Sequence, residues 1–161
     1  MTKPDELKQY VRNIPDYPKP GIVFRDITPL LGRKELFREV VDLMSMSWTD
    51  SRVDLVAAIE ARGFIPGAAI AVKLNAGFVP IRKTGKLPWK TISDAYQLEY
   101  GIAELQVHSD AVEPGQRVLI VSHGGSMRAL RRHCVGDPVH PIENCGVYEL
   151  RYRDGAFAPV D

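Results

Sequence analysis

Hydrophobic and polar positions follow two periods along this chain, and each period predicts one kind of element. Apolar residues recur at helical spacing between Lys34 and Trp48, which predicts an amphipathic helix with its charged side chains on the opposite face. Short apolar runs and strict alternation are instead typical of strands. The strands predicted in this way are VDLVAAIEA from Val53, GFVPIRK at 77–83, ELQVHS at 104–109 and RVLIV at 117–121.

Proline, glycine and polar stretches mark the ends of these elements. Pro4 and Asp5 open a helix predicted over residues 4–13, and the proline-rich IPDYPKPGIVF after it is predicted to be an extended arm. The polar stretch from Thr84 to Ile102 shows little periodicity and is predicted to be a long loop, a feature that is more often functional than idle.

The remaining segments complete an alternation of strands and helices. Helices are predicted from Gly63 to about Asn75 and from Ser126 to about Val135, a turn at Glu113-Pro114-Gly115, and a C-terminal hairpin around Asp154-Gly155. This order predicts an α/β fold, a single three-layer Rossmann-like domain over 1–161 with a mainly parallel central sheet. Ligands of such sheets bind beyond the carboxyl ends of the strands.

Composition narrows the classes of partner. With 21 Lys and Arg against 20 Asp and Glu, the chain has no large net charge that would attract nucleic acid or an anionic membrane. Any anion site must therefore be local. No apolar run approaches the ~20 residues that span a bilayer, and the N-terminus lacks the apolar core of a signal peptide, so we expect a cytoplasmic protein. Cys134 and Cys145 lack metal-ligand spacing, and no metal site is predicted.

Two basic segments lie where strands end. Arg62 follows a buried strand at the start of a helix, where backbone N–H groups and a guanidinium can surround an anion, although a solvated arginine at a strand end would have the same sequence. Arg82, Lys83, Lys86 and Lys90 lie within nine residues at the end of the next strand. Both loops should open on the same edge of the sheet, and the alternative for the second cluster is a solubilising charged loop.

Four segments, in this order and spacing, resemble the adenine phosphoribosyltransferase family across about residues 5–121: DYPKPGIVFRDITPLL, EARGF, GFVPIRKTGKLP and TISDAYQLEYG. The resemblance implies transfer of a phosphoribosyl group from phosphoribosyl pyrophosphate to adenine, giving AMP and pyrophosphate with Mg2+, and a homodimer. It assigns adenine contacts to Val23, Phe24 and Arg25, pyrophosphate contacts to Arg62, Arg82, Lys83 and Lys86, and a catalytic loop to Glu99 and Tyr100.

This chemistry suits those residue types. Displacement at the anomeric carbon passes through an oxocarbenium-like state, so cationic side chains must stabilise the departing pyrophosphate and a mobile loop must exclude water. Glu99 could hydrogen-bond the purine as the base gains charge.

The loop after RVLIV departs from that family's pattern. In the family this strand leads into two acidic residues and a Thr/Gly-rich loop that bind the ribose hydroxyls and the 5′-phosphate, whereas here it leads into Ser122-His123-Gly124-Gly125-Ser126. No adjacent acidic pair follows in the chain. Loss of two or three charged hydrogen bonds at ~1.5–3 kcal/mol each would weaken binding roughly 10³-fold, so the transferase site is incomplete and normal turnover is not expected.

The C-terminal segment has a resemblance of its own. RVLIVSHGGSMRALRRHCVGD followed by IENCGVYELRYRDGAF resembles the histidine phosphatase superfamily over about residues 117–161. That resemblance implies phosphate binding by His123, Gly124, Gly125 and Ser126, where glycines let a helix N-terminus approach the phosphate. The family's nucleophilic Arg-His-Gly motif is absent, and His108, His133 and His140 are interpreted as surface or packing residues.

The sequence thus predicts a hybrid, with residues 1–117 like the transferases and 118–161 like the phosphatases. Both parent families use a buried parallel strand followed by a phosphate-facing loop at the junction, so the hydrophobic pattern is kept. The leading hypothesis is a transferase-derived domain with weak or no AMP-forming activity. The alternatives are a non-catalytic scaffold that binds phosphate, pyrophosphate or AMP, and, ranked last, a phosphomonoesterase that uses His123.

Overall fold

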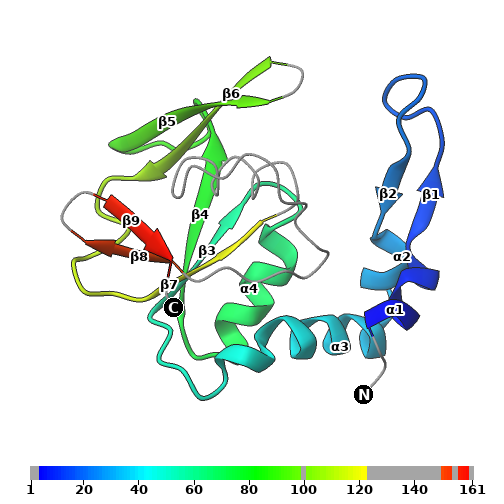
Figure 1. The fold of residues 1–161 in the computed structure, drawn as a ribbon, viewed down its shortest axis with the longest axis horizontal. Coiled ribbons are helices and arrows are strands. Elements are labelled where there is room, and N and C mark those ends of the chain that lie inside the picture. Colours follow the sequence, from blue (N-terminus) through cyan, green and yellow to red (C-terminus); the bar gives the residue numbers. More distant parts are fainter. Residues whose placement is uncertain (1–3, 99–100, 123–149, 154–155, 160–161) are drawn as a thin grey trace. The chain divides into compact units, whose positions relative to one another are not determined.

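The computed structural model describes residues 4–98, 101–122, 150–153 and 156–159. The chain divides into two compact units, Met1–Ser51 and Arg52–Asp161. Figure 1 labels their helices and strands along the chain. The organisation of residues 1–161 as one domain stays a prediction.

The first unit is a small hairpin with short helices before and after it. Its elements are α1 (Pro4–Leu7), the 3-10 helix η1 (Lys8–Tyr10), β1 (Arg12–Ile14), β2 (Phe24–Asp26), α2 (Thr28–Leu31), α3 (Lys34–Ser45) and the 3-10 helix η2 (Met46–Trp48). The amphipathic helix predicted between Lys34 and Trp48 is confirmed as α3 and η2. Its buried residues include Val41 and Ser45, and the Ser45 hydroxyl donates to the Val41 carbonyl at 2.7 Å.

Two predictions for the N-terminal region are wrong. The helix predicted over 4–13 ends earlier, because Arg12–Ile14 forms β1, which pairs antiparallel with β2. The proline-rich segment is therefore a hairpin connection and not an extended arm. Asp16 and Gly21 have positive φ angles of 56° and 83°, and the Asp16 carboxylate accepts a hydrogen bond from the Gly21 N–H at 2.7 Å, which closes the turn.

The second unit is built on a five-stranded sheet in the order β5-β6-β4-β3-β7. Its elements are β3 (Leu55–Ile59), α4 (Phe64–Lys73), β4 (Gly77–Lys83), β5 (Thr91–Leu98), β6 (Gly101–His108) and β7 (Val118–Val121), followed by the separate pair β8 (Leu150–Arg153) and β9 (Ala156–Pro159). Strands β4, β3 and β7 are parallel, whereas β6 and β5 add antiparallel pairs beside β4. The predicted α/β class is confirmed, and so is the C-terminal hairpin, because β8 and β9 pair antiparallel.

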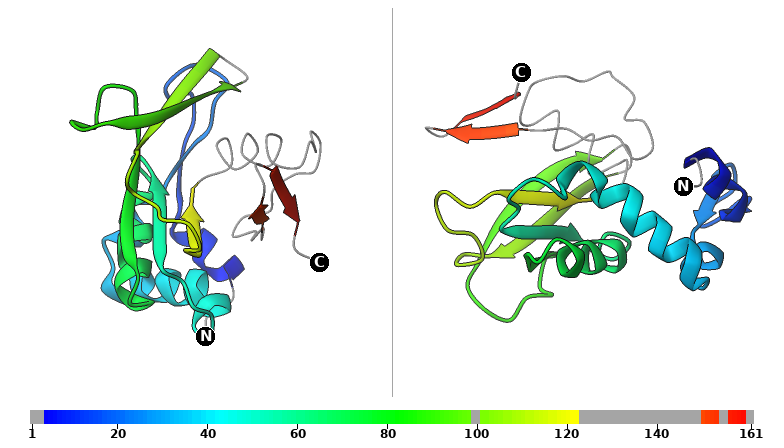
Figure 2. Two further views of the ribbon diagram at one scale, coloured as in Figure 1. Left: turned by 90° about the vertical axis from the view of Figure 1, so that its left-hand side faces the viewer. Right: turned by 90° about the horizontal axis from the view of Figure 1, so that it is seen from below.

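The core of the second unit lies around β3. Val56 and Ala58 are fully buried, and Ala57 and Ile59 are 4% and 7% exposed, as expected for a central strand. Helix α4 packs against β3 and β4 (Figures 1 and 2), where Phe64 meets Phe78 edge-to-face at 5.9 Å between ring centroids.

The loop predicted from Thr84 to Ile102 is largely a second hairpin. Strands β5 and β6 pair over their whole lengths, from Thr91 opposite His108 to Leu98 opposite Gly101. The β5 sequence gave no strand signal because β5 is an edge strand with exposed residues such as Ile92, which is 60% exposed. Since β6 pairs with β4 through Arg82 and Lys83, the hairpin projects beyond the carboxyl end of β4 (Figures 1 and 2).

Candidate functional site

The three parallel strands of the second unit end at one edge of the sheet. In the register, Ala58 of β3 lies opposite Pro80 of β4 and Val121 of β7. The segments that follow these strands therefore start side by side: Glu60–Gly63 after β3, Thr84–Lys86 after β4 and Ser122 after β7. The sequence prediction that both basic segments open on one edge is confirmed by this register.

The turn after β3 is held tightly against the sheet. The Glu60 N–H donates to the Ile81 carbonyl at 2.9 Å and the Gly63 N–H to the Ile59 carbonyl at 3.0 Å. The peptide bond between Glu60 and Ala61 is cis. A Cβ added at Gly63 would lie 2.6 Å from the Ile59 oxygen and 2.8 Å from the Val121 oxygen, so only glycine lets the start of α4 come this close to β3 and β7.

Arg82 is held by two contacts on this edge. Its Nε donates to the Glu60 carboxylate at 2.8 Å, and its Nη1 donates to the Lys86 carbonyl at 2.9 Å. The Glu60 side chain is only 13% exposed and that of Arg82 is 35% exposed. The arginine thus joins the turn after β3 to the loop after β4, which fixes the direction of its guanidinium.

The lysine loop, which we define as residues 83–86, is fastened to β6. The Thr84 hydroxyl donates to the Glu104 carboxylate at 2.8 Å, and the Gly85 N–H donates to the Gln106 side-chain oxygen at 3.0 Å. Hydrogen bonds from the Ser93 and Thr84 hydroxyls lower the pKa of Glu104. Lys83 and Lys86 stay exposed on this anchored turn, where Gly85 has a φ of 77°.

The chemistry of this edge suits an anion. Arg62 is exposed in the turn after β3, and the exposed Lys83 and Lys86 lie in the neighbouring loop. Among the residues the structure describes, no group of three His, Cys, Asp or Glu side chains could hold a metal ion. The exposed charged side chains described in these two loops are cationic, which suits an anion and not a bare metal ion.

The candidate adenine residues lie in the first unit. Phe24 and Arg25 belong to β2, and Val23 directly precedes it. Val23 is 49% exposed, and the Tyr17 ring meets Phe24 edge-to-face at 5.2 Å. The Arg25 guanidinium donates to the Asn13 side-chain oxygen on β1.

Other predicted site residues lie outside the described part of the chain. These are Glu99 and Tyr100, between β5 and β6, and His123, Gly124, Gly125 and Ser126, after β7. Their roles stay predictions. Next to the second group, the Ser122 hydroxyl oxygen is buried and has no hydrogen-bond partner among the described residues.

The residues that orient these side chains were not predicted from the sequence. Glu60, Glu104 and Gln106 each anchor a basic residue or the lysine loop, and Asp26 anchors the end of β2. The sequence signal that could have identified Glu60 is its place in the EARGF segment, two positions before Arg62. The partners on β6 lie in the segment 104–109, which was predicted to be a strand, but the antiparallel pairing of β6 with β4 that brings them to the lysine loop has no local sequence signal.

Comparison with known proteins relates the chain to two families. The chain is 56% identical to the adenine phosphoribosyltransferase of Thermotoga sp. (strain RQ2) over 131 residues, which cover 79% of this chain and 77% of the relative. The crystal structure of adenine phosphoribosyltransferase from Rhodothermus marinus superposes with a TM-score of 0.73 at 47% identity, covering 80% of this chain and 75% of that one. The Saccharomyces cerevisiae enzyme, complexed with adenine and an imino-altritol bisphosphate, gives a TM-score of 0.70 at 33% identity, covering 78% and 76%.

The second match concerns the C-terminal part. Residues 102–161 match the family described as histidine phosphatase superfamily (branch 1). The transferase match covers 79% of the chain, so the two matches overlap. Among the described residues, no helix has the length and apolar character needed to cross a membrane.

Proposed function

Because the chain belongs to the adenine phosphoribosyltransferase family, we propose that it binds adenine and pyrophosphate through the family's elements but forms AMP weakly or not at all. Val23, Phe24 and Arg25 serve adenine, and Arg62, Arg82, Lys83 and Lys86 serve pyrophosphate. The relatives that match over most of their length support the transferase assignment. The loss of activity rests on the segment after β7.

The observation that carries the proposal is the register of β7 with β3. Val121 lies opposite Ala58, so the segment from Ser122 begins beside the Glu60–Gly63 turn, where the family's acidic pair should follow the strand. This chain has Ser122, His123 and Gly124 there and no adjacent acidic pair later. The ribose hydroxyls and the Mg2+ that the family uses with its substrate therefore lose their carboxylate partners, and Glu99 and Tyr100 have no complete substrate to enclose.

Two overlapping matches and the pairing of β7 support a chimeric origin. The chain matches the transferases and the histidine phosphatase superfamily over overlapping parts. Strand β7 lies in the overlap and keeps the buried parallel pairing that both kinds of segment need. The exchange replaces the loop and the elements after it while the sheet is preserved.

Calorimetry of three ligands tests the proposal. Adenine and pyrophosphate should bind, and phosphoribosyl pyrophosphate with Mg2+ should bind no more than about tenfold more tightly than pyrophosphate, because its ribose and 5′-phosphate gain few contacts. Binding roughly 10³-fold tighter than pyrophosphate would show that the ribose is recognised and would contradict the proposal.

A pair of lysine variants checks the pyrophosphate site. Lys83→Gln should weaken pyrophosphate binding by about tenfold, since an exposed cation that contacts the ligand is lost. Lys90→Gln removes another exposed lysine of the same segment that has no assigned contact, and its affinity should match that of the unmodified chain. Equal losses in the two variants would indicate general attraction by surface charge.

A second candidate function is a non-catalytic phosphate or AMP binder, favoured by the histidine phosphatase match over residues 102–161. In that case His123, Gly124, Gly125 and Ser126 hold the phosphate. Phosphate or AMP at 100 times its dissociation constant should then stabilise the chain by ~2.7 kcal/mol in thermal unfolding. An unchanged melting temperature with both ligands would remove this candidate.

A further inference from the structure

Strand β2 is held at both ends by polar contacts. At the tip of the hairpin, the Tyr17 N–H donates to the Ile22 carbonyl at 3.1 Å, and the Gly21 N–H donates to the Asp16 carboxylate at 2.7 Å. At the other end, Asp26 is the last residue of β2. The exposed Val23 and the strand residues after it lie between these two anchors.

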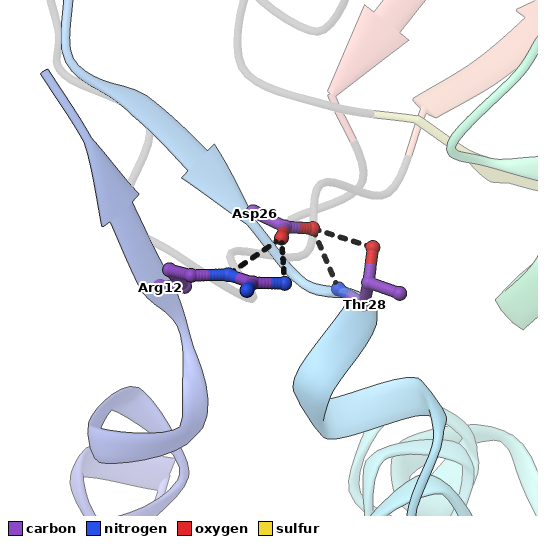
Figure 3. Close-up of polar contacts among 3 residues, drawn as sticks. All are labelled: Arg12, Asp26 and Thr28. Atoms are coloured by element: carbon purple, nitrogen blue, oxygen red, sulfur yellow. Dashed lines mark hydrogen bonds and ion pairs between the residues drawn. The ribbon is translucent and has the colours of Figure 1, made fainter.

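The Asp26 carboxylate joins three segments of the chain, as Figure 3 shows. Its Oδ2 accepts from the Arg12 guanidinium of β1, at 3.0 Å from Nε and 2.8 Å from Nη2. Its Oδ1 accepts from the Thr28 N–H at 2.9 Å and from the Thr28 hydroxyl at 2.5 Å, at the start of α2. The Asp26 side chain is 13% exposed although that of Arg12 is 60% exposed.

Burial of side chains does not by itself determine the position of β2. In the three residues of β2, the pattern is half-buried, exposed and half-buried, and β1 has two exposed residues of three. A lone two-stranded hairpin of this kind is marginally stable in water. The polar contacts of Asp26 therefore decide where β2 lies relative to β1 and α2.

The pleat places the anchor next to the candidate adenine ring contact. Phe24 and Asp26 are two residues apart in a strand and share one face, with Ile14 and Arg12 opposite them in the register. Arg25 lies on the other face, opposite Asn13. A shift of Asp26 would move Phe24 with it, because the two residues belong to the same short strand.

We propose that Asp26, clamped by Arg12 and Thr28, is a positioning residue that holds β2 in the geometry that recognises adenine. This inference rests on the proposed function, since it takes Val23, Phe24 and Arg25 as the adenine contacts. Asp26 does not touch the base in this account; it acts through the strand. The candidate pyrophosphate residues lie in the second unit and should not respond to it.

The test compares Asp26→Asn with Asp54→Asn in the full chain. Asp54 is a matched control because its carboxylate also accepts from an arginine Nε, that of Arg52 at 2.9 Å, and from a backbone N–H, that of Arg117 at 2.8 Å, but it lies at the amino end of β3. Calorimetry measures adenine and pyrophosphate binding for each variant, and circular dichroism with thermal melting verifies that each is folded.

We expect Asp26→Asn to weaken adenine binding by about tenfold or more and to change pyrophosphate binding by less than about twofold. Asp54→Asn should leave both affinities within about twofold of those of the unmodified chain. If Asp26→Asn does not fold, Thr28→Val replaces it. That variant removes the hydroxyl donor, keeps the backbone N–H donor, and should still weaken adenine binding selectively.

Other outcomes separate the two proposals. A folded Asp26→Asn protein with unaltered adenine affinity, or with equal losses for both ligands, overturns the positioning role and leaves the proposed function standing. An unmodified chain that binds pyrophosphate but no adenine overturns the adenine assignment, and the positioning role is rejected with it.

Discussion

Gly63 lies where any side chain would meet two strands at once. The oxygens of Ile59 and Val121 both lie within 2.8 Å of the position that a Cβ would take. Backbone oxygens cannot rotate away as the end of a flexible side chain can. The start of α4 would have to move, and with it the turn that carries Arg62.

Gly63→Ala should therefore lower the free energy of unfolding by about 1–3 kcal/mol, as overpacking does, and weaken pyrophosphate binding. Urea unfolding and calorimetry measure the two effects. Gly32→Ala is the control, since its Cβ would lie 3.4 Å from one oxygen, that of Thr28, an ordinary contact. Similar losses in both variants would contradict this account of Gly63.

The pKa of Asp54 determines part of the loss of stability that we expect for the second unit in acid. A hydrogen bond from the Arg117 N–H lowers the pKa of Asp54 from its ordinary value of 3.8, and a hydrogen bond from Arg52 lowers it further. The unfolded chain therefore binds the proton more readily than the folded chain. The stabilisation by Asp54 is present above pH 3.8 and is lost as the pH falls below that value through the lowered folded-state pKa.

Urea midpoints measured between neutral pH and acid pH should show this loss. Asp54→Asn should make the acid-dependent part of the decline smaller, because the variant no longer has this carboxylate. Arg52→Gln should reduce it less, since the Arg117 N–H has the larger effect on the pKa. An Asp54→Asn variant with the acid dependence of the unmodified chain would contradict this assignment.

At the scale of single residues, motifs could identify charges but not their partners. Arg82, Lys83 and Lys86 were predicted from their cluster, and the structure places them at the expected sheet edge. The Glu60 contact depends on the pairing of β3 with β4, which brings residues 22 positions apart within 2.8 Å. Such long-range contacts have no local sequence signal.

At the scale of elements, burial decides which predictions are confirmed. Helix α3 and strands β3 and β4 were predicted because one face or both faces are buried, so their apolar spacing is regular. Strands β1 and β5 were missed. Two of the three β1 residues and residues 92–95 of β5 are exposed, and tertiary pairing rather than hydrophobic pattern makes these segments strands.

The β6 strand has a function beyond pairing, because Gln106 holds the lysine loop through the Gly85 N–H. Gln106→Ala should increase amide hydrogen exchange at Gly85 roughly fivefold, the effect of losing about 1 kcal/mol, and should weaken pyrophosphate binding several-fold. Exchange measured by NMR and calorimetry give the two values.

The control is Gln116→Ala. Gln116 makes the same kind of bond, since its side-chain oxygen accepts from the Glu113 N–H at 2.7 Å, in the predicted turn before β7. That variant should increase exchange at Glu113 and leave pyrophosphate binding unchanged. If Gln116→Ala weakens pyrophosphate binding and Gln106→Ala does not, the anchoring role of β6 is contradicted.

At the scale of the whole molecule, most of the chain matches the adenine phosphoribosyltransferases, and residues 102–161 match the histidine phosphatase superfamily. The parallel direction of β4, β3 and β7 was predicted from the alternation of strands and helices, whereas their order in the sheet was not. The antiparallel addition of β6 and β5 was not, because it depends on an exposed edge. The fold thus follows from the pattern of buried strands, whereas the proposed loss of activity rests on an acidic pair that this pattern does not require.

Steady-state AMP formation from adenine and phosphoribosyl pyrophosphate with Mg2+ is the most direct measurement of the central claim, with the Thermotoga relative assayed beside this chain. We predict that kcat/KM falls at least about 10³-fold below that of the relative, while calorimetry under the same conditions still detects pyrophosphate binding. A kcat/KM within about tenfold of the relative's value would contradict the account, because the segment after β7 would then perform the work of the missing acidic pair.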